Sequence, residues 1–188
     1  MKSRVVGFVA TVALAAAAIG GIPSGAVAQQ SPQANIAILD YQRILRDSAA
    51  AVDIRAQIER QRQFYQEEIT EQEQELRAAD QELGRQRAIL STEAFAQKRR
   101  EFEERVTKVQ RGVQTRKREL DQAYDYGLKQ VQVALLEIIS ELAGQRGFNL
   151  VLARQQVVFS DKALNISDEV LLRLNERLPK VAVPLAQN

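Results

Sequence analysis

A stretch of about a hundred residues without proline, from Ser48 to Gln145, limits the possible folds of this chain more than any other feature. Glu, Gln, Arg, Lys, Ala and Leu fill most of it, and all six are good helix formers. Ser91 lies inside the stretch and belongs to the residue types that favour helix N-caps. We therefore predict a long helix up to Leu90, a tight reversal, and a second long helix from about Thr92.

The apolar spacing within this stretch predicts that the two helices pair. Ile69, Leu76, Leu83 and Leu90 recur every seventh residue, and folding the chain at Ser91 pairs residues whose numbers sum to about 181 or 182. Leu76 then meets Val106, and Ile69 meets Val113. The prediction is an antiparallel coiled-coil arm over residues 48–127, on the order of 60 Å long.

The chain begins with the features of a targeting segment. Lys2 and Arg4 form a basic region, an apolar run follows, and Ala26-Val27-Ala28 forms a small-x-small cleavage site. The alternative is an uncleaved membrane anchor, but the run is shorter than the roughly 20 residues that a span needs. We expect a signal peptide over residues 1–28, a disordered tail over 29–34, and a periplasmic mature protein.

The composition excludes several functions. The chain has no cysteine and no histidine, so it cannot build a disulfide, a Ser-His triad or an imidazole metal site. It also lacks a glycine-rich phosphate loop, and its acids follow a helical charge pattern. We expect no enzyme activity, no catalytic or metal-binding residue, and no cofactor. The formal charge of +2 equals the two targeting-segment bases, so the mature chain is neutral by count.

Short apolar segments on either side of the arm predict a small β-containing body over residues 35–47 and 128–180. The expected strands are 35–40, 148–153 and a returning 157–159, and Ser167 is the expected N-cap of a last helix ended by Pro179. A tail would follow over 181–188. The sequence thus predicts a mostly α, α+β fold.

The second long helix becomes apolar on several sides beyond Gly127, so it must enter the body or pack against copies of itself. Three strands also leave unpaired edges. Both features predict assembly of several chains. The expected interface residues are Ile36, Ile38, Leu128, Val131, Leu135, Ile138, Ile139 and Leu142.

The whole mature chain resembles the Skp/OmpH family of periplasmic chaperones. The resemblance rests on Asn35-Ile36-Ala37-Ile38-Leu39-Asp40, Leu90-Ser91-Thr92-Glu93-Ala94, Phe148-Asn149-Leu150-Val151-Leu152 and Asn165-Ile166-Ser167-Asp168-Glu169-Val170-Leu171. It implies a jellyfish-like homotrimer that holds unfolded outer-membrane proteins without ATP. Its best-known members are strongly basic, whereas this mature chain is neutral. The resemblance therefore gives less support to client capture by charge and to lipopolysaccharide binding than to the other properties.

The arm supplies the candidate client contacts. The apolar candidates are Phe64, Ile89, Phe95 and Phe102, although the last two also fit as ordinary seam residues. A basic excess near the tip could attract acidic clients, lipopolysaccharide or a membrane surface, or could be a solvated helix face; it consists of Arg85, Arg87, Lys98, Arg99 and Arg100. Gly112 and Gly127 are the expected hinges, because glycine weakens a helix interior by about 1 kcal/mol.

Three functions fit these features: a holdase chaperone, a structural periplasmic spacer or adaptor, and a nucleic-acid binder. The targeting segment argues against nucleic acid, as does the lack of aromatic residues among the tip's bases. A spacer favours a continuous stiff seam, whereas this seam is interrupted by Gln72, Gln86, Arg99, Arg116 and glycines. The interruptions favour the holdase.

Overall fold

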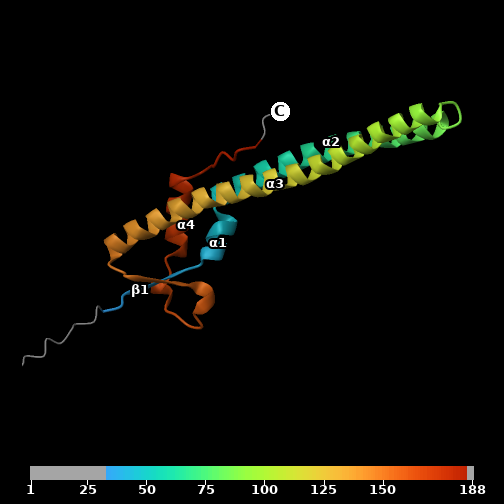
Figure 1. The fold of residues 1–188 in the computed structure, drawn as a ribbon. Coiled ribbons are helices and arrows are strands. Elements are labelled where there is room, and N and C mark those ends of the chain that lie inside the picture. The colour runs from blue at the N-terminus through green and yellow to red at the C-terminus, as the bar shows by residue number, and fades with distance from the viewer. Residues whose placement is uncertain (1–32, 186–188) are drawn as a thin grey trace, which may run out of the picture. The chain divides into compact units, whose positions relative to one another are not determined.

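The computed structural model describes residues 33–185 of the 188-residue chain. The expected signal peptide and most of the expected 29–34 tail lie outside these residues. Figure 1 shows two long helices running side by side, with the short strands and the last helix gathered near one end of the pair. The observed fold is mostly helical with two short strands, which confirms the predicted class.

The strands form a two-stranded parallel sheet. Strand β1 (Ile36–Leu39) pairs with β2 (Leu150–Ala153), so that Ile36 lies opposite Leu150 and Leu39 opposite Ala153. Parallel strands need a long crossover, and here the two arm helices supply it. On its other edge β1 forms an isolated bridge, in which Ile166 N donates to Ile38 O at 3.0 Å.

The expected returning strand at 157–159 is wrong. A 3₁₀ turn over Arg154–Gln156 follows β2, and residues 157–160 then run without a strand partner in the described chain. Val158 and Phe159 are 105% and 91% exposed. A strand needs a neighbour to bond with, and no segment within the described residues pairs with the free edge of β2.

An aspartate caps the N-terminus of the first helix, and a serine caps that of the second. Helix α1 (Tyr41–Asp47) starts at Asp40, whose carboxylate accepts from Arg43 N at 2.9 Å. The extended backbone of Ser48 separates it from α2 (Ala49–Gln86), and the Ser48 hydroxyl accepts from Ala51 N at 3.4 Å. This buried serine therefore sets the direction in which the arm leaves the body.

The reversal falls where the sequence predicts it. Helix α2 ends at Gln86, four residues before the expected end, because residues 87–90 form the turn. Helix α3 (Thr92–Arg146) follows, and its N-cap Ser91 accepts from Ala94 N at 3.2 Å. Cross-hairpin contacts lie close to the predicted register: Glu75 pairs with Arg105 at 3.7 Å, and Glu68 pairs with Arg116 at 2.8 Å.

Helix α3 ends at Gly147, whose φ of 74° is the left-handed conformation that glycine adopts readily at a helix C-terminus. Gly144, three residues earlier, lies within the helix. The last helix is α4 (Ser167–Arg177), and its N-cap is Ile166. The prediction that Ser167 caps it is wrong, because the Ser167 hydroxyl bonds to Asp40 N and Asn165 Oδ1.

The core lies where the body meets the start of α2 and the end of α3. All seven buried residues of helix α3 lie between Ala123 and Leu142. Residues 181–185 are not a loose tail, because Val181 is only 6% exposed and Val183 packs against the core. The buried core members are Ala37, Leu39, Ile44, Ala50, Ile54, Ile58, Ala123, Val131, Ala134, Leu135, Ile138, Leu142, Phe148, Ile166, Val170, Leu174 and Val181.

The two expected hinge glycines have different surroundings. A Cβ at Gly112 would meet nothing within 4 Å. At Gly127 it would lie 3.0 Å from Ile54 Cδ1 and from Val183 Cγ1. Gly127 therefore permits close packing at the arm root, and its conformational freedom is not used in this packed state.

This difference predicts opposite effects of alanine. Gly127→Ala should lower the free energy of unfolding by about 1–3 kcal/mol, because the buried Ile54 side chain has little room to move. Gly112→Ala should raise it by about 0.5–1 kcal/mol through helix propensity. Urea unfolding followed by circular dichroism measures both. Equal stabilisation by the two substitutions would contradict the packing role of Gly127.

Candidate functional site

The arm beyond Tyr65 packs its seam only partly. No residue from 66 to 122 is buried, and the seam positions are half-buried at best. A groove of about 530 Å³ opens beside the seam, and its lining includes Leu76, Val109 and Gly112. The apolar seam is therefore within reach of solvent along much of the arm. Its half-buried apolar members are Ile69, Leu76, Leu83, Leu90, Phe95, Phe102, Val106, Val109, Val113 and Leu120.

The four predicted apolar contact residues divide into two pairs. Ile89 at the turn is 81% exposed, and Phe64 is 36% exposed. Phe95 and Phe102 are half-buried in the seam, as the alternative interpretation of these residues predicts. The structure therefore does not gather the four into one patch: they are distributed along the arm.

The predicted basic residues all lie on exposed surface near the turn. Arg85 pairs with Glu82 at 3.5 Å, and Arg99 pairs with Glu103 at 2.8 Å, each within its own helix. Arg87, Lys98 and Arg100 form no ion pair within residues 33–185, although Arg100 donates to Gln97 at 2.7 Å. Exposed pairs along one helix stabilise it by only a few tenths of a kcal/mol. The tip thus keeps a local positive excess.

A polar cluster closes the seam where tight packing ends. Tyr65 is 7% exposed, its hydroxyl donates to Glu119 at 3.2 Å, and the Arg116 guanidinium lies 5.2 Å from its ring centroid. Arg116 also pairs with Glu68. Arg116, expected to interrupt the seam, thus links both helices. Burial raises the pKa of the Tyr65 phenol above its usual 10.0, and the neighbouring Glu119 raises it further.

Most of the predicted interface residues belong to the core of the single chain. Ile38, Val131, Leu135, Ile138 and Leu142 are each 2% exposed or less. Within the single chain these side chains are already covered, and those on α3 face α1, α2 and α4. The remaining three are half-buried: Ile36, Leu128 and Ile139.

The sequence prediction missed the apolar residues that the body leaves exposed. On α3, Leu136 is 64% exposed and Val133 48%, because they lie opposite the buried face. Their signal in the sequence is the apolar character on several sides of this helix. The others are Val52, Tyr126, Leu150, Val158, Phe159, Leu164 and Leu172.

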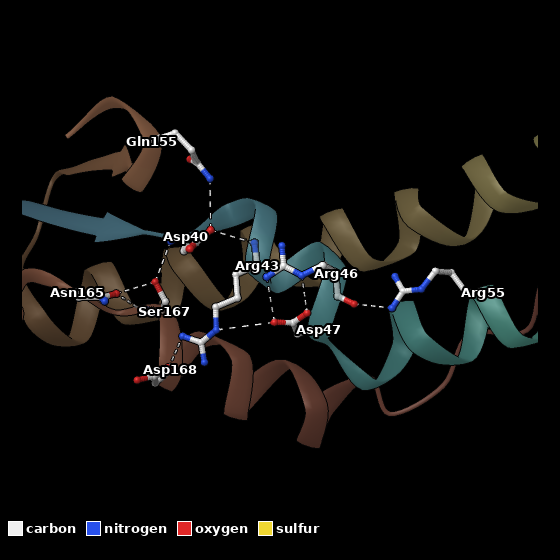
Figure 2. Close-up of polar contacts among 9 residues, drawn as sticks. All are labelled: Asp40, Arg43, Arg46, Asp47, Arg55, Gln155, Asn165, Ser167 and Asp168. Atoms are coloured by element: carbon white, nitrogen blue, oxygen red, sulfur yellow. Dashed lines mark hydrogen bonds and ion pairs between the residues drawn. The ribbon is translucent and has the colours of Figure 1, made fainter. Parts of the chain in front are cut away.

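The conspicuous polar network of the body is a structural joint (Figure 2). The Ser167 hydroxyl, 1% exposed, accepts from Asp40 N at 2.8 Å and donates to Asn165 at 2.6 Å. Arg43 pairs with Asp168 at 2.7 Å. These contacts tie the start of α1 to the start of α4. They explain why the segment 165–168 carries short polar side chains.

Within residues 33–185 there is no group of three acidic residues placed to hold a metal ion. None of the helices described in that range is long and apolar enough to cross a bilayer. Several acids of the arm form ion pairs along or across the hairpin, namely Glu59, Glu68, Glu75 and Glu103.

Together these features define a protein with an antiparallel coiled-coil arm on a small α/β body. The family model described as "Outer membrane protein (OmpH-like)" matches residues 35–174. The chain therefore belongs to the OmpH-like family.

A solved structure shares this fold at low sequence identity. It is an OmpH-like protein from Caulobacter crescentus CB15, named as a candidate outer membrane chaperone. The TM-score is 0.73 at 19% identity, and the match covers 81% of this chain and 90% of that one. No curated protein matches this chain significantly.

The raised pKa of Tyr65 predicts a specific alkaline effect. The unfolded phenol ionises near pH 10 and the folded one later, so the stabilisation is complete below pH 10 and is lost as pH rises through the folded pKa. Between pH 9 and 11, wild type should lose more unfolding free energy than Tyr65→Phe. Tyr126→Phe, at a 48% exposed site, is the control and should behave like wild type. Equal losses in wild type and Tyr65→Phe would contradict this prediction.

Proposed function

We propose that this chain is an ATP-independent periplasmic holdase that binds unfolded outer-membrane β-barrel proteins and prevents their aggregation. One observation carries the proposal: no side chain of the arm between residues 66 and 122 is fully buried. A structural spacer is the alternative function, and its stiffness would depend on a buried seam. This arm leaves its apolar seam partly open, next to a groove.

A partly open seam suits clients that share no fold. Apolar contact contributes roughly 25 cal/mol per Å² without requiring a fixed geometry. Ile89 and Phe64 add exposed apolar area at two separate places on the arm. Several arms around one cavity would raise the effective concentration of such weak sites, so a client could be held without any single strong contact.

The proposed assembly is a homotrimer. The unpaired edge of β2 and the exposed Val158 and Phe159 support it, because apolar side chains at this exposure are favourable mainly when another chain covers them. The interface would then use these residues in place of the core residues that the sequence suggested. Three bodies joined in this way would bring three arms together.

The positive excess at the tip supports a role in capture. Arg87, Lys98 and Arg100 would attract acidic clients, or an anionic membrane or lipopolysaccharide surface, over a Debye length of about 8–10 Å. Such steering affects the association rate more than the lifetime of the complex.

The decisive experiment is refolding of an outer-membrane β-barrel protein with and without the purified mature chain and without nucleotide. Suppressed aggregation, with the client recovered in a soluble complex, is the expected result. A spacer would leave the aggregation curve unchanged at every ratio of chain to client.

Charge reversal at the tip tests the capture step. The triple variant Lys98→Glu, Arg99→Glu and Arg100→Glu should lower the client association rate about tenfold at low salt and change the dissociation rate much less. Reversal of the exposed Arg77, Lys117 and Lys129, which do not line the groove, is the matched control for net charge. An equal effect of both triples would assign capture to overall charge and exclude a special role of the tip.

Substitution in the body tests the trimer. Val158→Ser with Phe159→Ser should raise the trimer dissociation constant at least about tenfold, because a buried Phe contributes roughly 1.5–3 kcal/mol. Sedimentation velocity at micromolar concentration measures it, and Ile89→Ser at the tip is the control. A monomeric wild type would contradict the trimer. Leu135→Ala, within the core, should instead destabilise the chain itself.

A further inference from the structure

The segment that follows α4 packs against the root of the arm. Residues 178–185, here called the C-terminal strap, run from the end of α4 alongside the long helices (Figure 1). Their burial alternates: Val181 is buried and Val183 and Leu185 are half-buried, whereas Ala182 and Pro184 are exposed. An alternating pattern is typical of an extended segment with one face against a surface. That surface is the junction of α2 and α3.

Gln57 of α2 holds the main chain of the strap at two points. Its Nε2 donates to Val181 O at 2.7 Å, and its Oε1 accepts from Val183 N at 3.4 Å. Asp53, one turn earlier, accepts from the same Nε2 at 2.8 Å and so orients the amide. One side chain thus bonds the carbonyl and the amide of two alternate residues, as a neighbouring strand would.

Gly127 of α3 makes room for this contact. Val183 Cγ1 would lie 3.0 Å from a Cβ at this position, and so would two atoms of Ile54 on α2. The strap therefore meets both arm helices at the glycine where a hinge was expected. Tight packing of the hairpin ends shortly beyond this point, at Tyr65.

The attachment of the strap is local. Besides the two Gln57 hydrogen bonds, Leu178 N donates to Leu174 O at 2.8 Å, and Leu185 N donates to Val183 O at 2.9 Å in a tight turn. The apolar side chains Val181, Val183 and Leu185 pack in or against the core. The strap forms no helix or strand, and a segment with few hydrogen bonds to the rest of the fold opens at low free-energy cost. The match to the family model ends at residue 174, before the strap begins.

We propose that the C-terminal strap is a detachable latch that restrains the arm root. While it is seated, Val183 and Ile54 hold α2 and α3 together at Gly127. When it leaves, the glycine is uncovered and the arm gains freedom to move relative to the body. The use of this movement, to hold clients of larger size, rests on the holdase function proposed above.

Hydrogen exchange tests the latch without any client. Val183→Asp places a charge against the apolar root, and Gln57→Leu removes both strap hydrogen bonds. Each should speed amide exchange about tenfold in residues 50–58 and 123–131, with no change around the turn at 86–95. The matched controls are Ala182→Asp and Gln63→Leu, both at exposed positions, and they should behave like wild type.

Two results would overturn the latch. One is unchanged exchange at the arm root in both variants. The other is equal loss of protection in α4 and in the root, which would show that the strap is an inseparable part of the folded body.

Client holding measured on the same proteins separates the two proposals. If the latch serves clients, Val183→Asp should hold larger clients than wild type does, while both hold small ones equally. An unchanged size range would overturn that use of the latch. If wild type holds no client, the holdase proposal fails, and the exchange data still decide the latch.

Discussion

The structure depends on one continuous helix, which is exposed along the arm and buried in the body. Helix α3 runs unbroken from the turn to its C-cap Gly147, so the arm and the body share one continuous helix. Its last third buries Val131, Leu135, Ile138 and Leu142 in the core that α3 shares with α1, α2 and α4, and such burial stabilises the fold. Because parallel strands need a long crossover, the hairpin also brings β1 and β2 together. Losing the packing of α3 would therefore separate the sheet as well as the arm.

The packing weakens steadily from the body to the turn. At the root, Ile54 and Ala123 are fully buried and Gly127 lets the strap approach. The Tyr65, Arg116 and Glu119 cluster then closes the well-packed part with hydrogen bonds and an ion pair in place of apolar contacts. Beyond it the seam is half-buried, and few buried contacts mean a low cost of local opening. A firm root with an adaptable arm is the arrangement that a holder of unfolded chains requires.

The polar contacts of this chain mainly fix the positions of the helices and strands, and they contribute less to the free energy of unfolding. Ser48 sets the angle between α1 and α2, and Ser167 fixes the start of α4 against β1. Both are buried, so their hydroxyls must be hydrogen-bonded, and each is bonded to main-chain groups that fix its position. The exposed ion pairs of the arm contribute little individually. Glu75 with Arg105 shows that such a pair places opposite charges across the hairpin.

The sequence by itself determined the arm: the helix-forming composition, the seam spacing and the cap at Ser91 are local signals, and the hairpin follows from them. The resemblance to the family followed from the order of four short segments around this hairpin. Tertiary structure alone decided which side chains stay exposed. Leu135 and Leu136 are adjacent and equally apolar, yet one is in the core and the other in solvent, because α2 and α4 cover one side of α3 only. The absent third strand, the role of Gly127 and the seated strap likewise depend on contacts between residues far apart in the sequence, which no local pattern records.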